Sequence, residues 1–341
     1  MKALMIHTRG GLGDLLLSSP LAEAVHLGHP GSEVWVWGNP KFTPVLENHP
    51  HIQGFFRPPD GAGLFAGAAA LRKCGFDCVL LPWSTSRQAW LSRLAGIPVR
   101  VGQGGRLSYS FLFTHPVRVR SVHGDVTSHW VDIQLDYARA LGLPVDGLRP
   151  QVYLTAAERR SGREFLSGLG IPAEKPVAAL QICKGLAVDA ERWPLDLFIA
   201  VGRGLAEEGY AVVLTGTENE RPLTERVRLG VGPAEIHNIA GTGSLRQTAA
   251  ILSHCAVTIC PDTGTGHLAA ALGIPTVSIF ALKCDLAARW RPFGEIHRVV
   301  QPSAVSCGRS CVKESCPRFE CLLDVDPAAV LAAVREIARK G

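Results

Sequence analysis

The sequence contains no apolar run near the length of about 18 residues that a membrane-spanning helix requires. Its first residues, MKALMIHTRGG, lack the long apolar stretch and the small-residue cleavage site of a signal peptide, so we expect a cytoplasmic protein with reduced thiols. Charged residues are scarce at 19%, below the usual fraction of about 25%, and the net charge is only +5 with no basic block. These features argue against a nucleic-acid partner and suit an anionic substrate or an acidic membrane surface.

Internal repeats and low-complexity tracts are also missing, and a hydrophobic content of 47% with low net charge excludes a disordered chain. The length of 341 residues predicts two domains, because a domain averages about 150 residues. A Gly- and Pro-rich stretch at 141–150 is the expected linker. We therefore expect domains at 1–150 and 151–326, followed by a C-terminal helix within 327–341 that Asp326 caps.

Short apolar runs alternate with helical segments in both halves of the chain. Strands are expected at 3–6, 34–37, 52–56, 78–81, 99–101, 177–182, 211–215, 236–239, 257–260 and 276–280. Helices are expected at 15–27, 42–47, 64–73, 87–94, 155–169, 195–208, 222–229, 245–252, 267–272 and 327–340. Continuous apolar strands between helices predict parallel sheets covered on both faces. The expected class is α/β, with two Rossmann-like doubly wound domains and a ligand cleft between them.

A glycine-rich loop follows the first expected strand and contains Arg9, Gly11, Gly13 and Asp14. It is not a dinucleotide fingerprint, because position 16 is Leu, and it lacks the Lys-Ser/Thr of a phosphate-binding Walker loop. Asp14 at a helix start is a preferred cap, which is the interpretation that local evidence favours. A carboxylate in a cleft is also a candidate general base.

A second motif, PDTGTGH at 261–267, lies between an expected strand and an apolar helix. Asp262, Thr263 and Gly264 at a helix N-terminus are typical of a phosphate site, because free amides and the helix dipole face the ligand there. The alternative is that these residues only cap the helix while His267 packs in its first turns.

Other candidate ligand residues follow the strands of the second half. Lys184 and Arg192 lie in the loop after the expected strand at 177–182, where either could pair with phosphate oxygens. Glu220 lies after the next strand and could accept ribose hydroxyls, although a solvated loop explains it locally as well.

Ten cysteines are many for such a chain, and four of them lie close together in a C-x3-C-x4-C-x4-C pattern. They are Cys307, Cys311, Cys316 and Cys321. Four thiolates in a reduced compartment suit a closed, structural zinc or iron site. Free thiols, or disulfides formed on oxidation, are the alternatives, and the other six cysteines fit buried apolar positions.

Taken together and in order, the motifs resemble glycosyltransferase family 9, the heptosyltransferases of lipopolysaccharide inner-core synthesis. The matching stretches are RGGLGDLLLSSP at 9–20, ERWP at 191–194, LTGTENE at 214–220, NIAGTGSLRQTAAIL at 238–252 and PDTGTGHLAAALGIPTVSIF at 261–280. The tail CLLDVDPAAVLAAV is similar to a cysteine-rich subset of that family. The resemblance implies a GT-B fold and inverting transfer from ADP-heptose without a catalytic metal. It also implies an acceptor glycan or glycolipid, and it leaves a peripheral association with the cytoplasmic face of the inner membrane open.

Carried over by motif position, Asp14 would deprotonate the acceptor hydroxyl in the N-terminal domain. Asp262, Thr263, Gly264 and His267 would hold the donor sugar and diphosphate, and Glu220 would match the ribose-binding acid. The chain departs from the family where Glu191 replaces a Lys and where Ala281-Leu282-Lys283 replaces Gly-Pro-Thr. Lys184, Arg192 or Lys283 could supply the missing cation, or Glu191 points away from the donor. These departures bear on the identity of the donor.

Two other functions remain open from the sequence. A non-catalytic sugar-nucleotide-binding or assembly protein is compatible with Glu191 at a position where the family has Lys. A nicotinamide-dependent oxidoreductase would share the expected Rossmann-like fold, but the broken glycine fingerprint argues against it.

Overall fold

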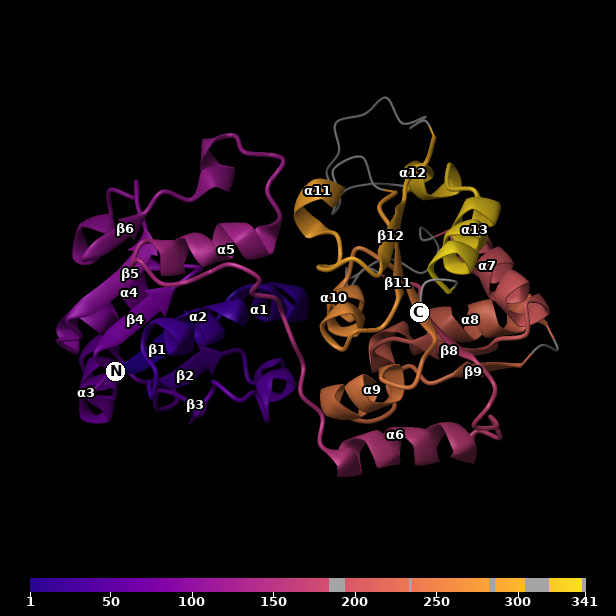
Figure 1. Cartoon of the computed structure of the whole chain (residues 1–341), viewed down its shortest axis with the longest axis horizontal. Helices are drawn as coiled ribbons and strands as arrows, with labels where there is room; N and C mark the ends of the chain where they lie inside the picture. Colours follow the sequence, from indigo (N-terminus) through magenta and orange to yellow (C-terminus); the bar gives the residue numbers. More distant parts are fainter. Residues whose placement is uncertain (184–193, 233–234, 282–285, 304–318, 339–341) are drawn as a thin grey trace. The chain divides into compact units, whose positions relative to one another are not determined.

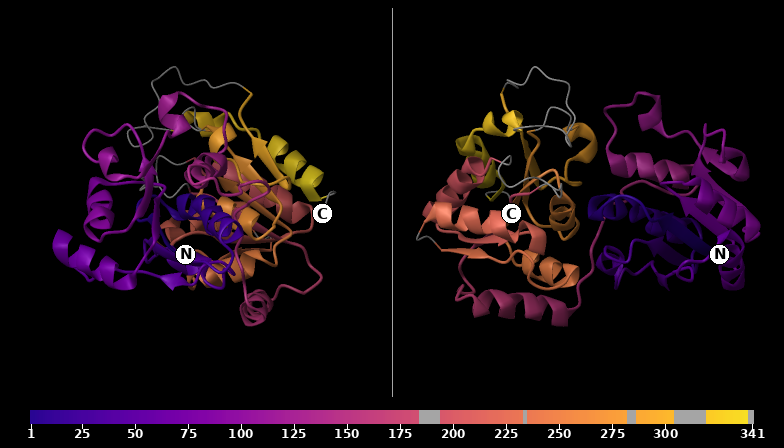
Figure 2. Two further views of the ribbon diagram at one scale, coloured as in Figure 1. Left: turned by 60° about the vertical axis from the view of Figure 1, so that its left-hand side comes forward. Right: turned by 180° about the vertical axis from the view of Figure 1, so that it is seen from behind.

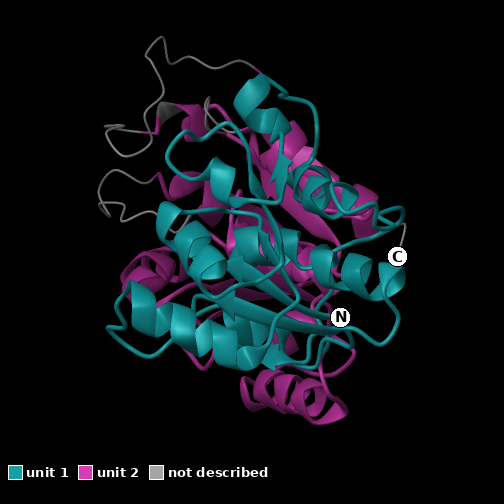
Figure 3. Cartoon of the chain, turned by 90° about the vertical axis from the view of Figure 1, so that its left-hand side faces the viewer, with its two compact units in different colours: residues 1–153 teal, residues 154–341 magenta. Residues whose placement is uncertain are grey.

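The computed structural model describes residues 1–183, 194–232, 235–281, 286–303 and 319–338. The chain forms two compact units, Met1–Tyr153 and Leu154–Gly341, which Figure 3 draws in two colours. The sequence predicts this boundary at residue 150. Each unit is built on its own six-stranded sheet.

The first unit alternates strands and helices along its whole length (Figure 1). Its strands are β1 (Lys2–His7), β2 (Glu33–Gly38), β3 (Gly54–Phe55), β4 (Cys78–Leu81), β5 (Val99–Gln103) and β6 (His115–Val117). Its α-helices are α1 (Leu12–Ser18), α2 (Pro20–Gly28), α3 (Leu64–Cys74), α4 (Ser86–Leu94) and α5 (Trp130–Arg139). Short 3₁₀ turns are η1 (Thr43–Leu46), η2 (Ser110–Leu112) and η3 (Arg120–His123).

The second unit repeats the same alternation. Its strands are β7 (Val177–Gln181), β8 (Ala211–Thr215), β9 (Ile236–Asn238), β10 (Val257–Pro261), β11 (Thr276–Ile279) and β12 (His297–Val300). Its helices are α6 (Ala156–Gly168), α7 (Asp196–Glu207), η4 (Glu218–Glu220), α8 (Arg221–Val231), α9 (Leu245–Leu252), α10 (Gly264–Ala271), α11 (Ala287–Trp290), α12 (Glu320–Leu323) and α13 (Pro327–Ala338). Among the described residues, no helix has both the length and the apolarity to cross a membrane.

Both sheets have the strand order of a doubly wound Rossmann fold. The first runs β3-β2-β1-β4-β5-β6 and the second, in the same sense, β9-β8-β7-β10-β11-β12. The strand pairs along both sheets are parallel. Strand order reverses between β1 and β4 and between β7 and β10, and the carboxyl ends of these strands are where such folds place ligands. The predicted fold class is confirmed.

Helices cover both faces of each sheet, as the two views of Figure 2 show. Consequently the central strands are buried along their full length, including every residue of β4, β7, β8, β10 and β11. In the second unit one core cluster joins Leu180 and Val212 from the sheet to Phe198 of α7, Val227 of α8 and Val330 of α13. Continuous burial explains why these strands read as unbroken apolar runs in the sequence.

Local chain geometry corrects two of the expected helices. The helix predicted over 15–27 is two helices, because Pro20 has no N–H to continue the ladder and opens α2 as its first residue. The Ser19 hydroxyl closes α1 by donating to the Leu16 carbonyl at 2.8 Å. The helix predicted over 42–47 is only the 3₁₀ turn η1, which contains Pro44.

Some elements have no counterpart in the sequence prediction. Strands β6 and β12 are short and contain polar residues, and each lies at one edge of its sheet. Helix α5 carries charged residues between its apolar positions, so its amphipathic period is easily overlooked. Helix α10 begins at Gly264 instead of His267, which moves the whole DTG motif to the helix start.

Candidate active site

The loop between β1 and α1 holds the Asp14 carboxylate in one place. Asp14 is the third residue of α1, and its Oδ2 accepts the Gly11 N–H at 2.8 Å. Gly10 has φ +82°, and a Cβ built there would lie 2.6 Å from Asp14 Oδ2, so the loop requires glycine. The structure corrects the predicted N-cap role of Asp14: Gly11 is the N-cap residue of α1, and Asp14 accepts its N–H from the third helical position. The same contact orients the half-buried carboxylate.

A polar pocket of about 590 Å³ opens at the carboxyl ends of β1, β2 and β4 in the first unit. Its lining comes from three places: Thr8 and Arg9 after β1, residues 37–40 at and after the end of β2, which include Trp37, and residues 85–88 at the start of α4. Gln88 joins two of these places, because its Nε2 donates to Thr8 Oγ1. The pocket contains hydroxyl, amide and guanidinium groups, the chemistry that binds a sugar bearing a negative charge.

Most pocket residues were not predicted from the sequence, since the connections after β2 and β4 carry no recognisable motif. The available signal was positional: they follow buried strands, and carboxyl ends of neighbouring parallel strands meet at one edge. His7, the last residue of β1, lies beneath the loop; it is 2% exposed, and burial lowers its pKa to about 4. Its ring meets Trp83 edge-on with 6.2 Å between centroids.

The DTG motif of the second unit joins the end of β10 to the first turn of α10. Thr263 is the N-cap and His267 lies four residues later, on the same side of that turn. Thr263 Oγ1 and His267 Nδ1 are both buried and, among the described residues, neither has a hydrogen-bond partner. His267 is 6% exposed, and burial lowers its pKa to about 4, so the ring is neutral near pH 7. Buried polar atoms without partners are uncommon and mark a place where a ligand can bind.

Gln181, at the end of β7, ties this turn to the neighbouring strand. Its Oε1 accepts the Thr215 hydroxyl at 2.8 Å and the Thr265 hydroxyl at 3.4 Å, and its Nε2 donates to the Cys183 carbonyl at 3.3 Å. Gln181 and Thr215 are buried. The network fixes the carboxyl ends of β7 and β8 to the first turn of α10, and the sequence offered no motif for it.

Glu220 closes the loop that follows β8. Its Oε2 accepts the Thr217 N–H at 2.7 Å, and a Cβ on Gly216 would lie 3.1 Å from that oxygen. Burial raises the pKa of the Cys183 thiol, and the negative charge of Glu220 nearby raises it further, to about 12. Glu220 is thereby held beside the end of β7, the strand next to β10 in the sheet.

Several predicted site residues lie outside the described residues. They are Lys184, Arg192, Lys283, Cys307, Cys311 and Cys316, together with Glu191. Cys321 is described, at the start of α12, and is 5% exposed. Within the described ranges there is no cluster of three or more His, Cys, Asp or Glu side chains that could hold a metal ion.

Known proteins with similar sequences and structures share this architecture. Lipopolysaccharide heptosyltransferase 2 of Salmonella typhimurium is 25% identical over 293 residues, covering 82% of each chain. The solved structure of Escherichia coli ADP-heptose lps heptosyltransferase II superposes with a TM-score of 0.81 at 22% identity, covering 100% of this chain and 99% of that one. The iron-containing dodecameric glycosyltransferase TibC from enterotoxigenic E. coli is more distant, with a TM-score of 0.56 at 17% identity, covering 99% of this chain and 76% of that one.

The family assignment rests on a match that covers more than half of the chain. The sequence profile of glycosyltransferase family 9 (heptosyltransferase) matches residues 65–318, which include the DTG motif and the Glu220 loop but not the loop that carries Asp14. The solved heptosyltransferase II structure supports the GT-B fold across both units. The chain therefore belongs to glycosyltransferase family 9, the heptosyltransferases, and is a glycosyltransferase.

Proposed function

We propose that this protein transfers a heptose, or a closely related sugar, from an ADP-linked donor to a hydroxyl group of an acceptor glycan or glycolipid. The reaction belongs to lipopolysaccharide core synthesis or the synthesis of a related glycan, on the cytoplasmic side of the inner membrane. The single observation that carries this proposal is the first turn of α10, where Thr263 Oγ1 and His267 Nδ1 are buried without partners among the described residues. The donors named for similar heptosyltransferases are ADP-heptoses.

The donor diphosphate would bind at the start of α10. The free amides of residues at a helix N-terminus and the helix dipole stabilise negative charge, and the leaving ADP gains negative charge as its bond to the sugar breaks. Asp262 and Thr263 lead into this turn, Gly264 is its first residue, and neutral His267 adds a hydrogen-bonding nitrogen. Lys184, Arg192 and Lys283 would neutralise the diphosphate in place of a metal ion, and Glu220 would accept a ribose hydroxyl.

Asp14 would act as the general base. Its carboxylate takes the proton from the acceptor hydroxyl while that oxygen forms a bond to the anomeric carbon of the donor sugar. The bond from the anomeric carbon to the diphosphate oxygen breaks, and ADP leaves with the electron pair. Attack and departure occur on opposite faces, so the configuration inverts. The capping contact with the Gly11 N–H uses Oδ2 and holds the carboxylate in a fixed orientation.

The acceptor would bind in the pocket of the first unit. Arg9 belongs to the same loop as Asp14, and Arg87 comes from the start of α4, so two guanidinium groups lie among the hydroxyl and amide groups of the lining. This combination fits a sugar that carries a phosphate or carboxylate group. The exposed Gly11 would let the loop backbone approach the acceptor closely, whereas Gly13, also predicted for this loop, is buried in the first turn of α1.

Product analysis tests the proposal. The protein is incubated with ADP-, GDP- and UDP-sugars, with and without a lipid A-linked acceptor glycan, and products are measured by mass spectrometry and NMR. We expect acceptor-dependent ADP release, an inverted anomeric linkage and no effect of EDTA on the rate. Tight donor binding without transfer to any acceptor would instead support a non-catalytic sugar-nucleotide-binding protein.

We further propose a structural metal ion at the four-cysteine cluster. The donor set of Cys307, Cys311, Cys316 and Cys321 fits zinc or iron, and a site filled by four thiolates leaves no open position for catalysis. The iron reported in TibC supports the same idea in a distant structural relative. Elemental analysis of protein purified under reducing conditions should find about one ion per chain. The Cys307→Ser/Cys311→Ser variant should lose it and Cys74→Ser should keep it, whereas metal-free wild-type protein would refute the site.

A further inference from the structure

We propose that α4 and the segment 105–111 form a membrane-binding surface that docks on an anionic lipid leaflet. The inference rests on the proposed function in one respect: a glycolipid acceptor requires an enzyme that works at a bilayer. The surface is defined by the exposed side chains of Trp90, Arg93, Arg106, Leu107 and Phe111. All five lie in the first unit, near the edge of its sheet that ends in β6.

Three apolar side chains of this surface face solvent. Leu107 is 100% exposed, Phe111 68% and Trp90 38%. Trp90 on α4 and Phe111 on η2 contact each other edge-to-face, with 6.1 Å between ring centroids, so they form one patch from two elements. Tryptophan and phenylalanine beside an exposed leucine are the residues that insert into the boundary between headgroups and acyl chains.

The stretch of sequence that carries this patch has charged residues of one sign only. The sequence contains no Asp or Glu between Asp77 and Asp125, although this stretch includes six arginines. Arg93 and Arg106 are exposed, and within the part of the chain that the structure describes neither guanidinium group has an ion-pair partner. Arginines without counterions beside apolar side chains complement the negative surface potential of anionic lipids.

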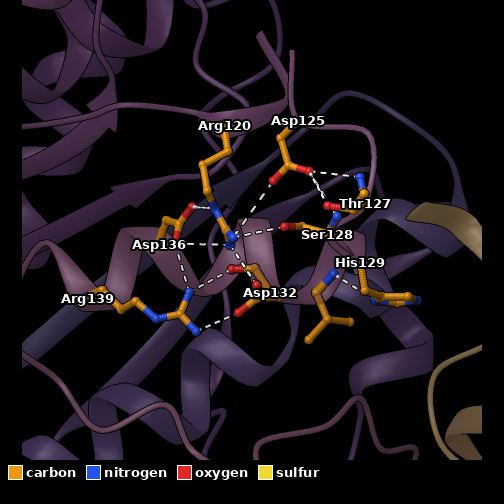
Figure 4. Close-up of polar contacts among 9 residues, drawn as sticks. Arg120, Asp125, Thr127, Ser128, His129, Asp132, Asp136 and Arg139 are labelled. Carbon is orange, nitrogen blue, oxygen red and sulfur yellow. Dashed lines mark hydrogen bonds and ion pairs between the residues drawn. The ribbon is translucent and has the colours of Figure 1, made fainter. Parts of the chain in front are cut away.

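The nearest acidic residues after this stretch are already paired. Arg120 Nη2 binds Asp132 at 2.7 Å and its Nε binds Asp136 at 2.8 Å, and Arg139 bridges the same two carboxylates (Figure 4). Asp125 accepts the N–H groups of residues 127 and 128 at 2.9 Å. Two arginines among these three carboxylates leave one net negative charge, which is smaller than the two positive charges of Arg93 and Arg106.

The surface is continuous with the acceptor pocket through a single helix. Residues 85–88, at the start of α4, line the pocket, and Trp90 and Arg93 follow on the same helix. A glycolipid whose sugar enters the pocket would have its lipid part in the bilayer beneath α4. Docking through this surface would thus bring the pocket to the level of the membrane-anchored acceptor.

Vesicle co-sedimentation of the full-length protein tests the inference. Binding is measured with phosphatidylcholine vesicles and with vesicles that also contain phosphatidylglycerol. We expect binding to the anionic vesicles only, weakened by added salt. Arg93→Gln/Arg106→Gln should lower the partition coefficient about 25-fold, at about fivefold for each arginine. Leu107→Ser/Phe111→Ser should lower it by a similar factor, because both side chains lose their apolar contact with lipid.

Matched controls use exposed residues of the second unit. Leu229→Ser on α8, where Leu229 is 65% exposed, and Arg160→Gln on α6, an exposed arginine, should bind vesicles like the wild type. Wild-type protein that ignores anionic vesicles, or surface variants that bind as the controls do, would overturn the inference. A third result would also overturn it: the wild-type protein is an oligomer that does not bind vesicles, and Leu107→Ser/Phe111→Ser converts it to monomers. The surface would then be an interface between two copies.

The two proposals fail separately. Transfer to a water-soluble acceptor fragment should be unchanged in both surface variants and in both controls, because none of the substituted residues lines the pocket. Normal transfer without vesicle binding would refute only the proposed membrane-binding surface. Vesicle binding without transfer to any acceptor would refute only the proposed function.

Discussion

A Cβ added to Gly10 would lie only 2.6 Å from Asp14 Oδ2, because the carboxylate folds back over the loop to accept the Gly11 N–H. Gly10 also has φ +82°, a backbone conformation that L side chains rarely adopt. The backbone of the loop and the carboxylate therefore fit together only when residue 10 is glycine. The predicted general base is thus positioned by a residue that has no side chain.

Gly10→Ala should displace Asp14 and lower sugar transfer. We expect a loss of stability of about 1–2 kcal/mol from the strained backbone and, in addition, a fall in kcat. Gly61→Ala is the matched control, since Gly61 also has a positive φ of +65° but its Cβ would meet nothing within 4 Å. Thermal unfolding and steady-state kinetics are measured for both variants. Equal loss of kcat in both would show that the contact with Asp14 does not matter.

Asp14→Asn should abolish transfer while donor binding survives. The amide oxygen of Asn can still accept the Gly11 N–H, so the fold is kept, but the side chain can no longer take a proton at neutral pH. We expect kcat to fall about 10²–10⁴-fold, with an unchanged Kd for ADP by calorimetry. Asp60→Asn, in an exposed loop, serves as the control. Turnover near that of the wild type would disprove the assignment of Asp14 as base.

Acid should destabilise the protein through its buried histidines. Burial lowers the pKa of His7 and of His267 to about 4, whereas an unfolded histidine titrates near 6.5. Between these values the unfolded chain binds more protons, so the free energy of unfolding falls as the pH drops from 6.5 towards 4. Each buried ring accounts for about 3 kcal/mol at the acid end.

Urea unfolding from about pH 4.5 to 7.5 measures this linkage. The His267→Gln variant should show a shallower fall in the free energy of unfolding on acidification, because it lacks one proton-binding group. His29→Gln, at an exposed position, should keep the wild-type slope. A His267→Gln slope identical to that of the wild type would contradict the neutral, buried state of this ring.

Thr265→Val should loosen the first turn of α10. The substitution removes the hydroxyl that donates to Gln181 Oε1 at 3.4 Å, and we expect a loss of about 1 kcal/mol together with weaker ADP binding. Thr265→Ser keeps the hydroxyl and should restore both values. Unfolding and calorimetric titration with ADP are the measurements. ADP affinity that stays constant in Thr265→Val would place the diphosphate away from this turn.

Much of the fold could be predicted because a strand that is buried on both faces has an unbroken apolar sequence. β4, β8 and β10 read as unbroken apolar runs between helical segments, and that alternation alone indicates parallel, doubly wound sheets. The edge strands β6 and β12 have no such apolar run, since they are short and partly exposed. Pro20 could have predicted the break between α1 and α2, but the helical spacing of apolar residues continues across it.

The sequence by itself determined the two α/β halves and the places of the DTG motif and Asp14 near helix starts, because each depends on neighbours within a few residues. Only the tertiary structure decided which loops meet. The pocket joins residues after β1, β2 and β4, and the Gln181 network joins β7, β8 and α10, since strand order and not chain order sets which carboxyl ends lie together. The exposed pair of Trp90 and Phe111 likewise depends on α4 packing against η2, a contact between segments far apart in the sequence.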